Sequence, residues 1–229
     1  MMRAEFEPGI DQHDELNPKL WAGKKLLPDV ESALIKIAQD FKKFIDVPFD
    51  VVDLRITGGQ VSYFYTKHSD LDLHLVADYS SVVCDREAAE LFDAKRLLYK
   101  NRFDITVKGI PVELYVEDLD HPAVSASYSI MKRQWITPPS QNPNDIDQEE
   151  IKRMSAVWQK IIGHVMTSND AKTAKKTLDL LRNYRKLGLK RTGEYGTANL
   201  VYKTLRNSKS VETLTNFIDQ EHEKNLSIK

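Results

Sequence analysis

The residues best suited to chemistry are two aspartates, Asp70 and Asp72, which a single leucine separates. Polar and apolar residues alternate over 70–75, and this alternation predicts a strand with one polar and one apolar face. Side chains two residues apart on a strand point the same way, about 7 Å apart at a rise of ~3.3 Å per residue. Two such carboxylates repel each other unless a cation lies between them, and their hard oxygens suit Mg²⁺.

A glycine pair, Gly58 and Gly59, precedes Asp70 by ten residues. Without Cβ atoms, the backbone N–H groups of such a turn can close on an anion. The glycines, the spacer and the aspartate strand together indicate a site for a nucleoside triphosphate and a metal. A simple alternative stays open, because a glycine turn before an edge strand with solvated aspartates has the same sequence. His74 lies on the polar face too, where it is more typical of a supporting or surface residue than of a ligand.

This pattern resembles the signature of the DNA polymerase beta-like nucleotidyltransferase superfamily, in which two small residues precede an Asp-x-Asp strand. Over residues 17–229 the chain is similar to predicted nucleotidyltransferases of tailed phages, which share the S-D-x-D-L-H run at 69–74. A downstream run is also similar, and its residues are Gly193, Glu194, Asn199, Leu200, Lys203, Leu205, Arg206 and Asn207. The resemblance implies an α+β fold with an α/β-type nucleotidyltransferase core, built on a small, mixed, mostly antiparallel sheet flanked by helices, and followed by a helical region.

The resemblance also implies a reaction. Such enzymes transfer a nucleoside monophosphate from an NTP to an acceptor hydroxyl with two Mg²⁺ ions, or Mn²⁺ in their place, and release pyrophosphate. Their acceptors include RNA ends, proteins, antibiotics and nucleotides. Many members carry a serine at the second glycine position, and its hydroxyl helps to hold the triphosphate. Because Gly59 has no hydroxyl, either backbone amides or Gln60 and Ser62 do this work, or nucleotide binding is weaker.

A third carboxylate is expected on a neighbouring strand, and Glu113 is our choice. It lies in the middle of a predicted strand between apolar residues, where a charge is costly unless something pairs with it. The resemblance likewise implies a third acid on a later strand. Asp104 and Glu117 are the reserve candidates, and an exposed glutamate on an edge strand is the alternative.

These expectations define a candidate site. Asp70, Asp72 and Glu113 are predicted to be catalytic and to bind the metal ions. The predicted nucleotide-binding residues are Gly58, Gly59, Gln60, Ser62, Lys67 and Ser69. The competing hypothesis is an inactive nucleotidyltransferase-fold module that binds RNA or protein, which Gly59 favours and the three acids disfavour. A transferase that modifies cationic small molecules stays open as well.

The composition is that of a soluble globular protein, with 41% hydrophobic and 29% charged residues among 229. No apolar run reaches the ~18–20 residues of a membrane span, so no membrane partner is expected. Residues 1–16 lack an apolar core and carry acids, which disfavours a secretory signal. Cys84 is the only cysteine and cannot form an intramolecular disulfide. We therefore expect a cytoplasmic protein, in the host cytoplasm if a phage encodes it.

The charge is unevenly distributed along the chain. Residues 151–229 hold 16 Lys+Arg and 7 Asp+Glu, whereas residues 1–150 hold 17 and 27. The basic part suits RNA or a nucleotide as the acceptor, although a solvated helical face has the same composition. The candidate phosphate contacts are Arg182, Arg185, Lys186, Lys190, Arg191, Lys203 and Arg206.

Three regions are predicted along the chain: an N-terminal arm over 1–26, a nucleotidyltransferase core over 27–140 and a helical domain over 141–229. The arm is expected to be anchored by Leu20 and Trp21. In the core, the patterns predict a helix from Leu27 that Pro48 ends, a strand over 51–56, a helix over 85–100, and strands 102–107 and 110–116 joined by a turn at Lys108-Gly109. Residues 60–66 fit either a short helix or an irregular segment.

Residues 120–135 have no clear pattern. Tyr128, Lys132, Arg133 and Trp135 could meet a base and phosphates, although Trp135 is better explained as a core anchor. The proline-containing stretch 137–147 predicts a linker. Beyond it we expect a helix capped by Asp147, a second capped by Asn169 or Asp170 and ended by Gly188, and two short helices over 197–207 and 211–224.

Overall fold

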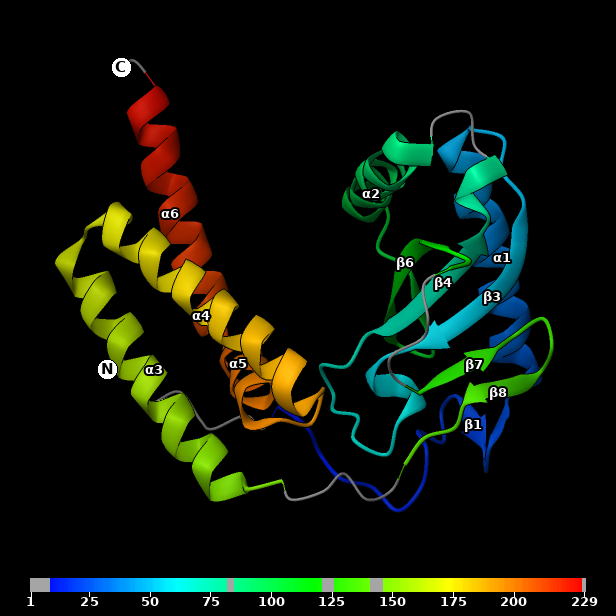
Figure 1. Ribbon diagram of the computed structural model, residues 1–229, viewed down its shortest axis with the longest axis horizontal. Coiled ribbons are helices and arrows are strands. Elements are labelled where there is room, and N and C mark those ends of the chain that lie inside the picture. The colour runs from blue at the N-terminus through cyan, green and yellow to red at the C-terminus, as the bar shows by residue number, and fades with distance from the viewer. Residues whose placement is uncertain (1–8, 82–84, 121–125, 141–145, 228–229) are drawn as a thin grey trace. The chain divides into compact units, whose positions relative to one another are not determined.

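A computed structural model describes residues 9–81, 85–120, 126–140 and 146–227 (Figure 1). The chain divides into two compact units, residues 12–141 and residues 1–11 with 142–229. The described part of the predicted arm is therefore divided, since residues 9–11 belong with the helices and Gln12 onwards with the sheet. Cys84 lies outside the described residues.

The first unit has a mixed α+β fold built on a six-stranded sheet in the order β5-β6-β4-β3-β7-β8. The strands are β3 (Val51–Thr57), β4 (Leu71–Ala77), β5 (Thr106–Val107), β6 (Ile110–Asp118), β7 (Ser127–Ser129) and β8 (Gln134–Thr137). Only β4 and β6 pair in parallel; the other neighbours are antiparallel. Parallel pairing needs a crossover, and helix α2 (Asp85–Arg102) lies in it.

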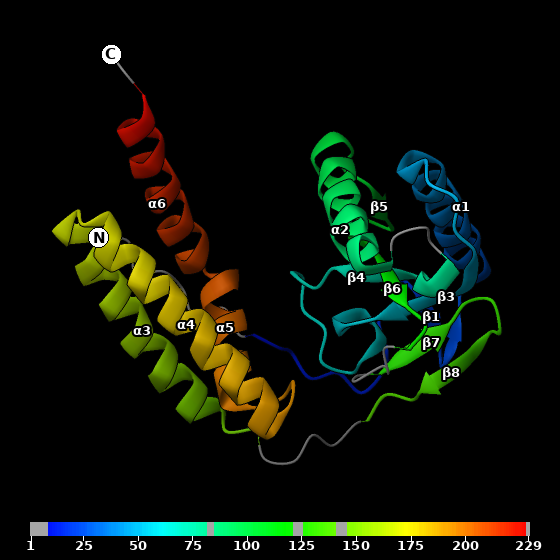
Figure 2. The same ribbon diagram turned by 45° about the horizontal axis from the view of Figure 1, so that its top comes forward.

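Helices α1 (Pro28–Ile45) and α2 lie side by side along the sheet (Figure 2). The apolar half of the alternating strand is buried, since Leu71, Leu73 and Leu75 are each 0% exposed. The rings of Phe41 and Tyr99 join the two helices, with centroids 5.0 Å apart. The predicted strand face therefore forms the core of the unit, and its polar face is left for Asp72 and His74.

The turn between β5 and β6 was predicted correctly. Lys108 and Gly109 both have positive φ, 54° and 79°, as a two-residue turn between antiparallel strands requires. Of residues 60–66, the first two lie in a short 3₁₀ turn, η1 (Gly59–Val61), and 62–66 are irregular. A second such turn, η2 (Tyr79–Ser81), follows β4.

Four short strands were not predicted: β7, β8, and the pair β1 (Trp21–Ala22) and β2 (Lys25–Leu26). They surround an aromatic cluster in which Trp135 stacks on Trp21 at 4.9 Å and Tyr128 meets both rings edge-on. Trp21 and Tyr128 are 3% and 4% exposed. Trp135 is therefore an anchor of this cluster, and the buried ring of Tyr128 is not available to stack on a base.

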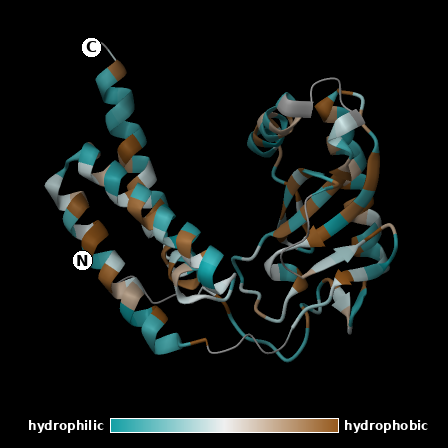
Figure 3. Cartoon of the chain, viewed as in Figure 1, coloured by the Kyte–Doolittle hydropathy of each residue, from teal (hydrophilic) through white to brown (hydrophobic). Residues whose placement is uncertain are grey.

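The second unit contains α3 (Gln148–Ser168), α4 (Ala171–Thr192), α5 (Thr197–Asn207) and α6 (Ser210–Leu226). Their apolar stripes form its core, which includes Leu181, Leu200 and Leu214 (Figure 3). The side chain of Asp147 caps α3 by accepting a hydrogen bond from the N–H of Glu150 at 2.8 Å. Asp170 caps α4, while Asn169 ends α3 in the left-handed conformation.

Gly188 does not end α4, contrary to our expectation. The helix continues to Thr192, and Gly193 at φ 73° follows it. Gly188 instead allows close helix packing, because a Cβ atom there would lie 2.3 Å from the Cβ of Ala198 on α5. In a sequence, a glycine that allows two helices to pack closely looks the same as a glycine that ends a helix. Only the packing distinguishes the two roles.

Candidate nucleotide and metal site

The register of the sheet brings two of the three predicted acids together. Asp72 on β4 pairs with Thr57 on one side and with Glu113 of β6 on the other. Residues directly paired across neighbouring strands point to the same face. Asp70 immediately precedes β4. The end of the sheet where β3 stops and β4 begins therefore carries the predicted acids.

The glycine turn lies against one of these acids. Gly58 has φ 80° and ψ −158°, and a Cβ atom on it would lie 2.0 Å from Oδ2 of Asp72. A Cβ atom on Gly59 would lie 2.8 Å from Oγ of Ser69. A side chain is therefore strongly disfavoured at Gly58 by the backbone conformation and the carboxylate together, whereas at Gly59 it would require the Ser69 side chain to move.

Gln60 and Ser62 lie inside the loop and hold its shape. Gln60 is 2% exposed; its amide donates to the carbonyl of Ser69 at 2.7 Å and accepts from Asn17 at 2.8 Å. The indole of Trp21 donates to the carbonyl of Gln60 at 2.9 Å. The Oγ of Ser62 donates to the carbonyl of Gly59 at 2.9 Å. These side chains position the turn. Asn17 and Trp21, which sequence reasoning did not link to the site, support it.

Lys67 and Ser69 lie in the turn before β4. The Oγ of Ser69 accepts from the N–H of Thr66 at 2.9 Å, and Ser69 is partly exposed. Lys67 is exposed. Both precede Asp70 within a few residues, so they share the end of the sheet on which the acids lie.

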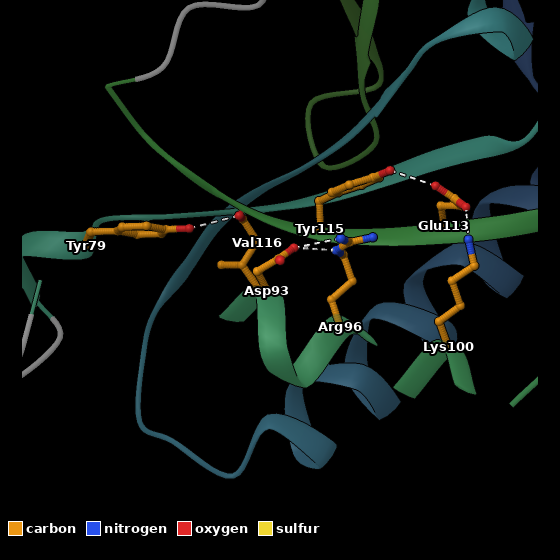
Figure 4. A network of polar contacts seen from close by, with 7 residues as sticks. All are labelled: Tyr79, Asp93, Arg96, Lys100, Glu113, Tyr115 and Val116. Carbon is orange, nitrogen blue, oxygen red and sulfur yellow. Dashed lines mark hydrogen bonds and ion pairs between the residues drawn. The ribbon is translucent and has the colours of Figure 1, made fainter. Parts of the chain in front are cut away.

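Glu113 is held by two donors. Lys100 of α2 donates to Oε1, and the hydroxyl of Tyr115 donates to Oε2 at 2.7 Å (Figure 4). The Glu113 side chain is 21% exposed. Burial alone would raise the pKa of Glu113, but the hydrogen bonds from Lys100 and Tyr115 outweigh it, and the pKa is lowered. Glu113 is therefore an ionised, well-positioned carboxylate beside Asp72.

Next to these acids on the polar face lies a second pair of side chains, Tyr115 and His74. Their rings stack at 4.7 Å, and the guanidinium of Arg96 lies 5.0 Å from the Tyr115 ring. Burial and the bond to Glu113 raise the pKa of Tyr115, which keeps its hydroxyl protonated as a donor. His74 Nδ1 lies 2.9 Å from Glu117 and Nε2 lies 3.1 Å from Oγ1 of Thr57. His74 thus supports the strands, and the reserve acid Glu117 is its partner.

A cavity of about 340 Å³ adjoins the acids. Asp70 and Glu113 line it together with the reserve acid Asp104 and residues of α2. Its cations, Arg96 and Lys100, were not predicted, because their spacing on α2 is also that of an ordinary solvated helix face.

The carboxylates fit a magnesium ion in chemistry and in part in arrangement. Mg²⁺ usually takes one or two protein carboxylates, and the Asp70–Asp72 strand offers that number. Within the described ranges, no group of three or more His, Cys, Asp or Glu side chains could hold a metal. Lys100 neutralises Glu113, so the aspartate pair is the better ligand set.

Of the seven cations predicted to contact phosphate in the helical unit, five are exposed: Arg182, Lys186, Lys190, Arg191 and Arg206. Arg185 is used within the unit, because its Nε donates to Asn199 at 2.9 Å and its guanidinium lies 4.6 Å from the Tyr202 ring. Lys203 is partly buried. The exposed cations lie mainly on α4.

No family model, curated protein or solved structure matches the chain. Among the helices in the described part of the chain, none has the length and apolar character needed to cross a membrane.

Proposed function

We propose that the chain is a metal-dependent nucleotidyltransferase that moves a nucleoside monophosphate from an NTP to an acceptor hydroxyl. The observation that carries this proposal is the contact of Gly58 with Asp72, which in turn pairs with Glu113. A glycine turn and a row of acids therefore share one end of the sheet. That combination suits phosphoryl chemistry, in which catalysis is mostly positioning and charge stabilisation.

The donor triphosphate would bind at the turn. Neither Gly58 nor Gly59 has a side chain that could cover its N–H group, and Lys67 and Ser69 are close enough in sequence to assist. Gln60 and Ser62 hold the turn from inside by their hydrogen bonds. This arrangement replaces the serine hydroxyl of related enzymes with backbone donors.

Asp70 and Asp72 would hold Mg²⁺ or Mn²⁺, which when bound neutralises the phosphates and the charge that develops on the pyrophosphate. Glu113, paired with Lys100, lies beside them. Because its pKa is lowered, Glu113 is a weaker proton acceptor than an ordinary glutamate. In the reaction, the acceptor oxygen bonds to the α-phosphorus, the bond to the bridging pyrophosphate oxygen breaks, and the hydroxyl proton is released to solvent.

A labelled-NTP transfer assay against RNA, nucleotide and protein acceptors tests the proposal. Asp70→Asn and Asp72→Asn should each lower transfer by about 100-fold or more, since even residues that only support metal ligands cost ~10–100-fold. Asp50→Asn is the matched control, because Asp50 is exposed at the opposite end of β3. Equal transfer by wild type, Asp70→Asn and Asp72→Asn would contradict the proposal.

An inactive binding module is the second candidate, and the ion pair of Glu113 with Lys100 favours it. In such a module, Lys100 would permanently occupy the position of a metal. Calorimetry with a nonhydrolysable NTP and Mg²⁺ separates the candidates. If the wild type binds the nucleotide and Asp72→Asn does not, the result supports the enzyme. If the wild type does not bind the nucleotide, the result supports the binding module.

A further inference from the structure

The cavity beside Glu113 is lined by both charged and apolar side chains. Two cations of α2, Arg96 and Lys100, line it together with an apolar surface that includes Phe103, Pro111 and Val112. The ring of Phe103 is 39% exposed although it is large and apolar. A small ligand with an anionic group and a flat apolar part matches these walls.

The sheet order separates this cavity from the glycine turn. The turn follows β3, Asp72 lies on β4 with Asp70 just before it, and the cavity lies by α2 and β6, the next strand in the order β3-β4-β6. A triphosphate bound at the turn therefore leaves the cavity on the far side of the acids. Because Asp70 and Glu113 line the cavity, a ligand within it meets the candidate site directly.

Arg96 is held in a fixed orientation. Its Nε and Nη2 atoms both donate to Oδ1 of Asp93, at 2.9 and 2.7 Å, and its guanidinium lies 5.0 Å from the Tyr115 ring. The Arg96 side chain is 19% exposed. An arginine carries five N–H donors in a rigid fork, so two bonds to Asp93 leave further donors for an anion. Figure 4 shows Arg96 and Lys100 projecting from α2 towards the strand of Tyr115 and Glu113.

Lys100 is the more exposed member of this pair. Its side chain is 56% exposed, and its ammonium group bonds Glu113 at the edge of the cavity. A lysine is a flexible point charge with three donors, so it can contact a phosphate without leaving the neighbourhood of Glu113. A fixed arginine and a flexible lysine one helical turn apart are well placed to bind a phosphate.

We propose that this cavity binds a nucleoside monophosphate unit of the acceptor, with its phosphate on Arg96 and Lys100 and its base against Phe103. That the bound nucleotide is the acceptor rests on the proposed function, whereas its binding in this cavity does not. The unit belongs either to a free nucleotide or to the end of an RNA chain. The cavity is also lined by the carboxylates Asp70, Asp104 and Glu113, so binding of a cationic small molecule in place of AMP is the alternative outcome, and it would overturn the proposal.

Titration of the full chain with AMP in EDTA, followed by calorimetry or NMR, tests the subsite without metal or turnover. Wild type should bind AMP, and adenosine should bind at least about tenfold more weakly because it lacks the phosphate. Lys100→Gln and Arg96→Gln should each weaken AMP binding by about tenfold. Lys100 is exposed, so Lys100→Gln should not disturb folding. It therefore tests the subsite even if Arg96→Gln impairs folding.

Lys95→Gln is the matched control, since Lys95 lies on the same helix but beside Phe44, 5.9 Å from its ring. It should bind AMP like the wild type. No binding to the wild type, equal binding of AMP and adenosine, or equal binding by all variants would overturn the proposal. A comparison of AMP with the dinucleotide ApA identifies the source, because tighter ApA binding indicates RNA and tighter AMP binding a free nucleotide.

The subsite and the proposed function fail separately. Asp72→Asn should abolish transfer but retain AMP binding. If the chain binds AMP through Arg96 and Lys100 but never transfers a nucleotide, the subsite is supported and the proposed function is wrong. If the chain transfers nucleotides but AMP binding is unchanged in Arg96→Gln and Lys100→Gln, the proposed function is supported and the subsite proposal is wrong.

Discussion

The two units each contain a partly buried glutamate, and they treat it in opposite ways. In the sheet unit, Glu113 receives hydrogen bonds from Lys100 and Tyr115, which outweigh its burial and lower its pKa. In the helical unit, burial of Glu194 is the largest influence and raises its pKa, although Lys203 and Tyr195 act against it. Only in the sheet unit do the donors around the glutamate outweigh its burial and lower its pKa.

The tightly packed glycines differ in the same way. Gly58 makes room for the carboxylate of Asp72, whereas Gly188 makes room for the methyl group of Ala198. Close approach therefore serves a charged group in the sheet unit and helix packing in the helical unit. The contrast indicates that the candidate site belongs to the sheet unit.

The largest expected difference is between Gly58→Ala and Gly109→Ala. Both glycines have φ near +80°, so alanine should cost each variant about 1–3 kcal/mol in the free energy of unfolding. Only at Gly58 would the new Cβ displace a carboxylate, because nothing lies within 4 Å at Gly109. Nucleotide transfer should therefore fall by about 100-fold or more in Gly58→Ala alone. Equal transfer by the two variants would show that the contact with Asp72 has no role in the site.

Smaller effects on stability, of opposite sign, are expected when alanine replaces two glycines within helices. Gly163→Ala on α3 should stabilise the protein by about 1 kcal/mol, since nothing lies within 4 Å and alanine favours helix. Gly188→Ala gains the same propensity but forces α4 against Ala198, a cost of about 1–3 kcal/mol. Urea unfolding measures both. Stabilisation by Gly188→Ala would mean that α4 and α5 separate easily and that close packing does not explain this glycine.

The smallest expected effects concern the two glutamates and their pH dependence. Glu113→Gln should destabilise the protein by about 0.5–1 kcal/mol at pH 7, because a lowered pKa means that ionisation of Glu113 favours folding. This contribution is present above its ordinary pKa of 4.5 and is lost as the pH falls through the lowered value. Glu194→Gln should instead stabilise at pH 7, by about 1 kcal/mol or less, because a raised pKa means that ionisation opposes folding.

The pH dependence of the two variants provides the check. The penalty from Glu194 is absent well below pH 4.5, grows as the pH rises, and levels off above its raised pKa. Unfolding measured at pH 3.5 and pH 7 should therefore show both differences from the wild type shrinking at the lower pH. Effects of the same sign for the two variants would remove the contrast between the units.

The sequence alone was enough for the local features. Alternation over 70–75 predicted which face of β4 is buried, because side chains alternate by geometry along any strand. Asp147 and the Lys108-Gly109 turn were also predicted correctly, since caps and tight turns depend on a few adjacent residues. The acids and glycines of the candidate site could be selected for the same reason, as a spacing along one segment.

Tertiary structure decided how those segments meet. The parallel register that sets Glu113 beside Asp72 depends on α2 carrying the chain back to the sheet, and no residue near Glu113 encodes it. Burial of Gln60 beneath the turn depends on Asn17 and Trp21, 43 and 39 residues away. The sequence by itself determined which residues could hold a phosphate or a metal. Long-range packing determined which of them share one end of the sheet, because side-chain proximity between distant segments is a property of the folded core.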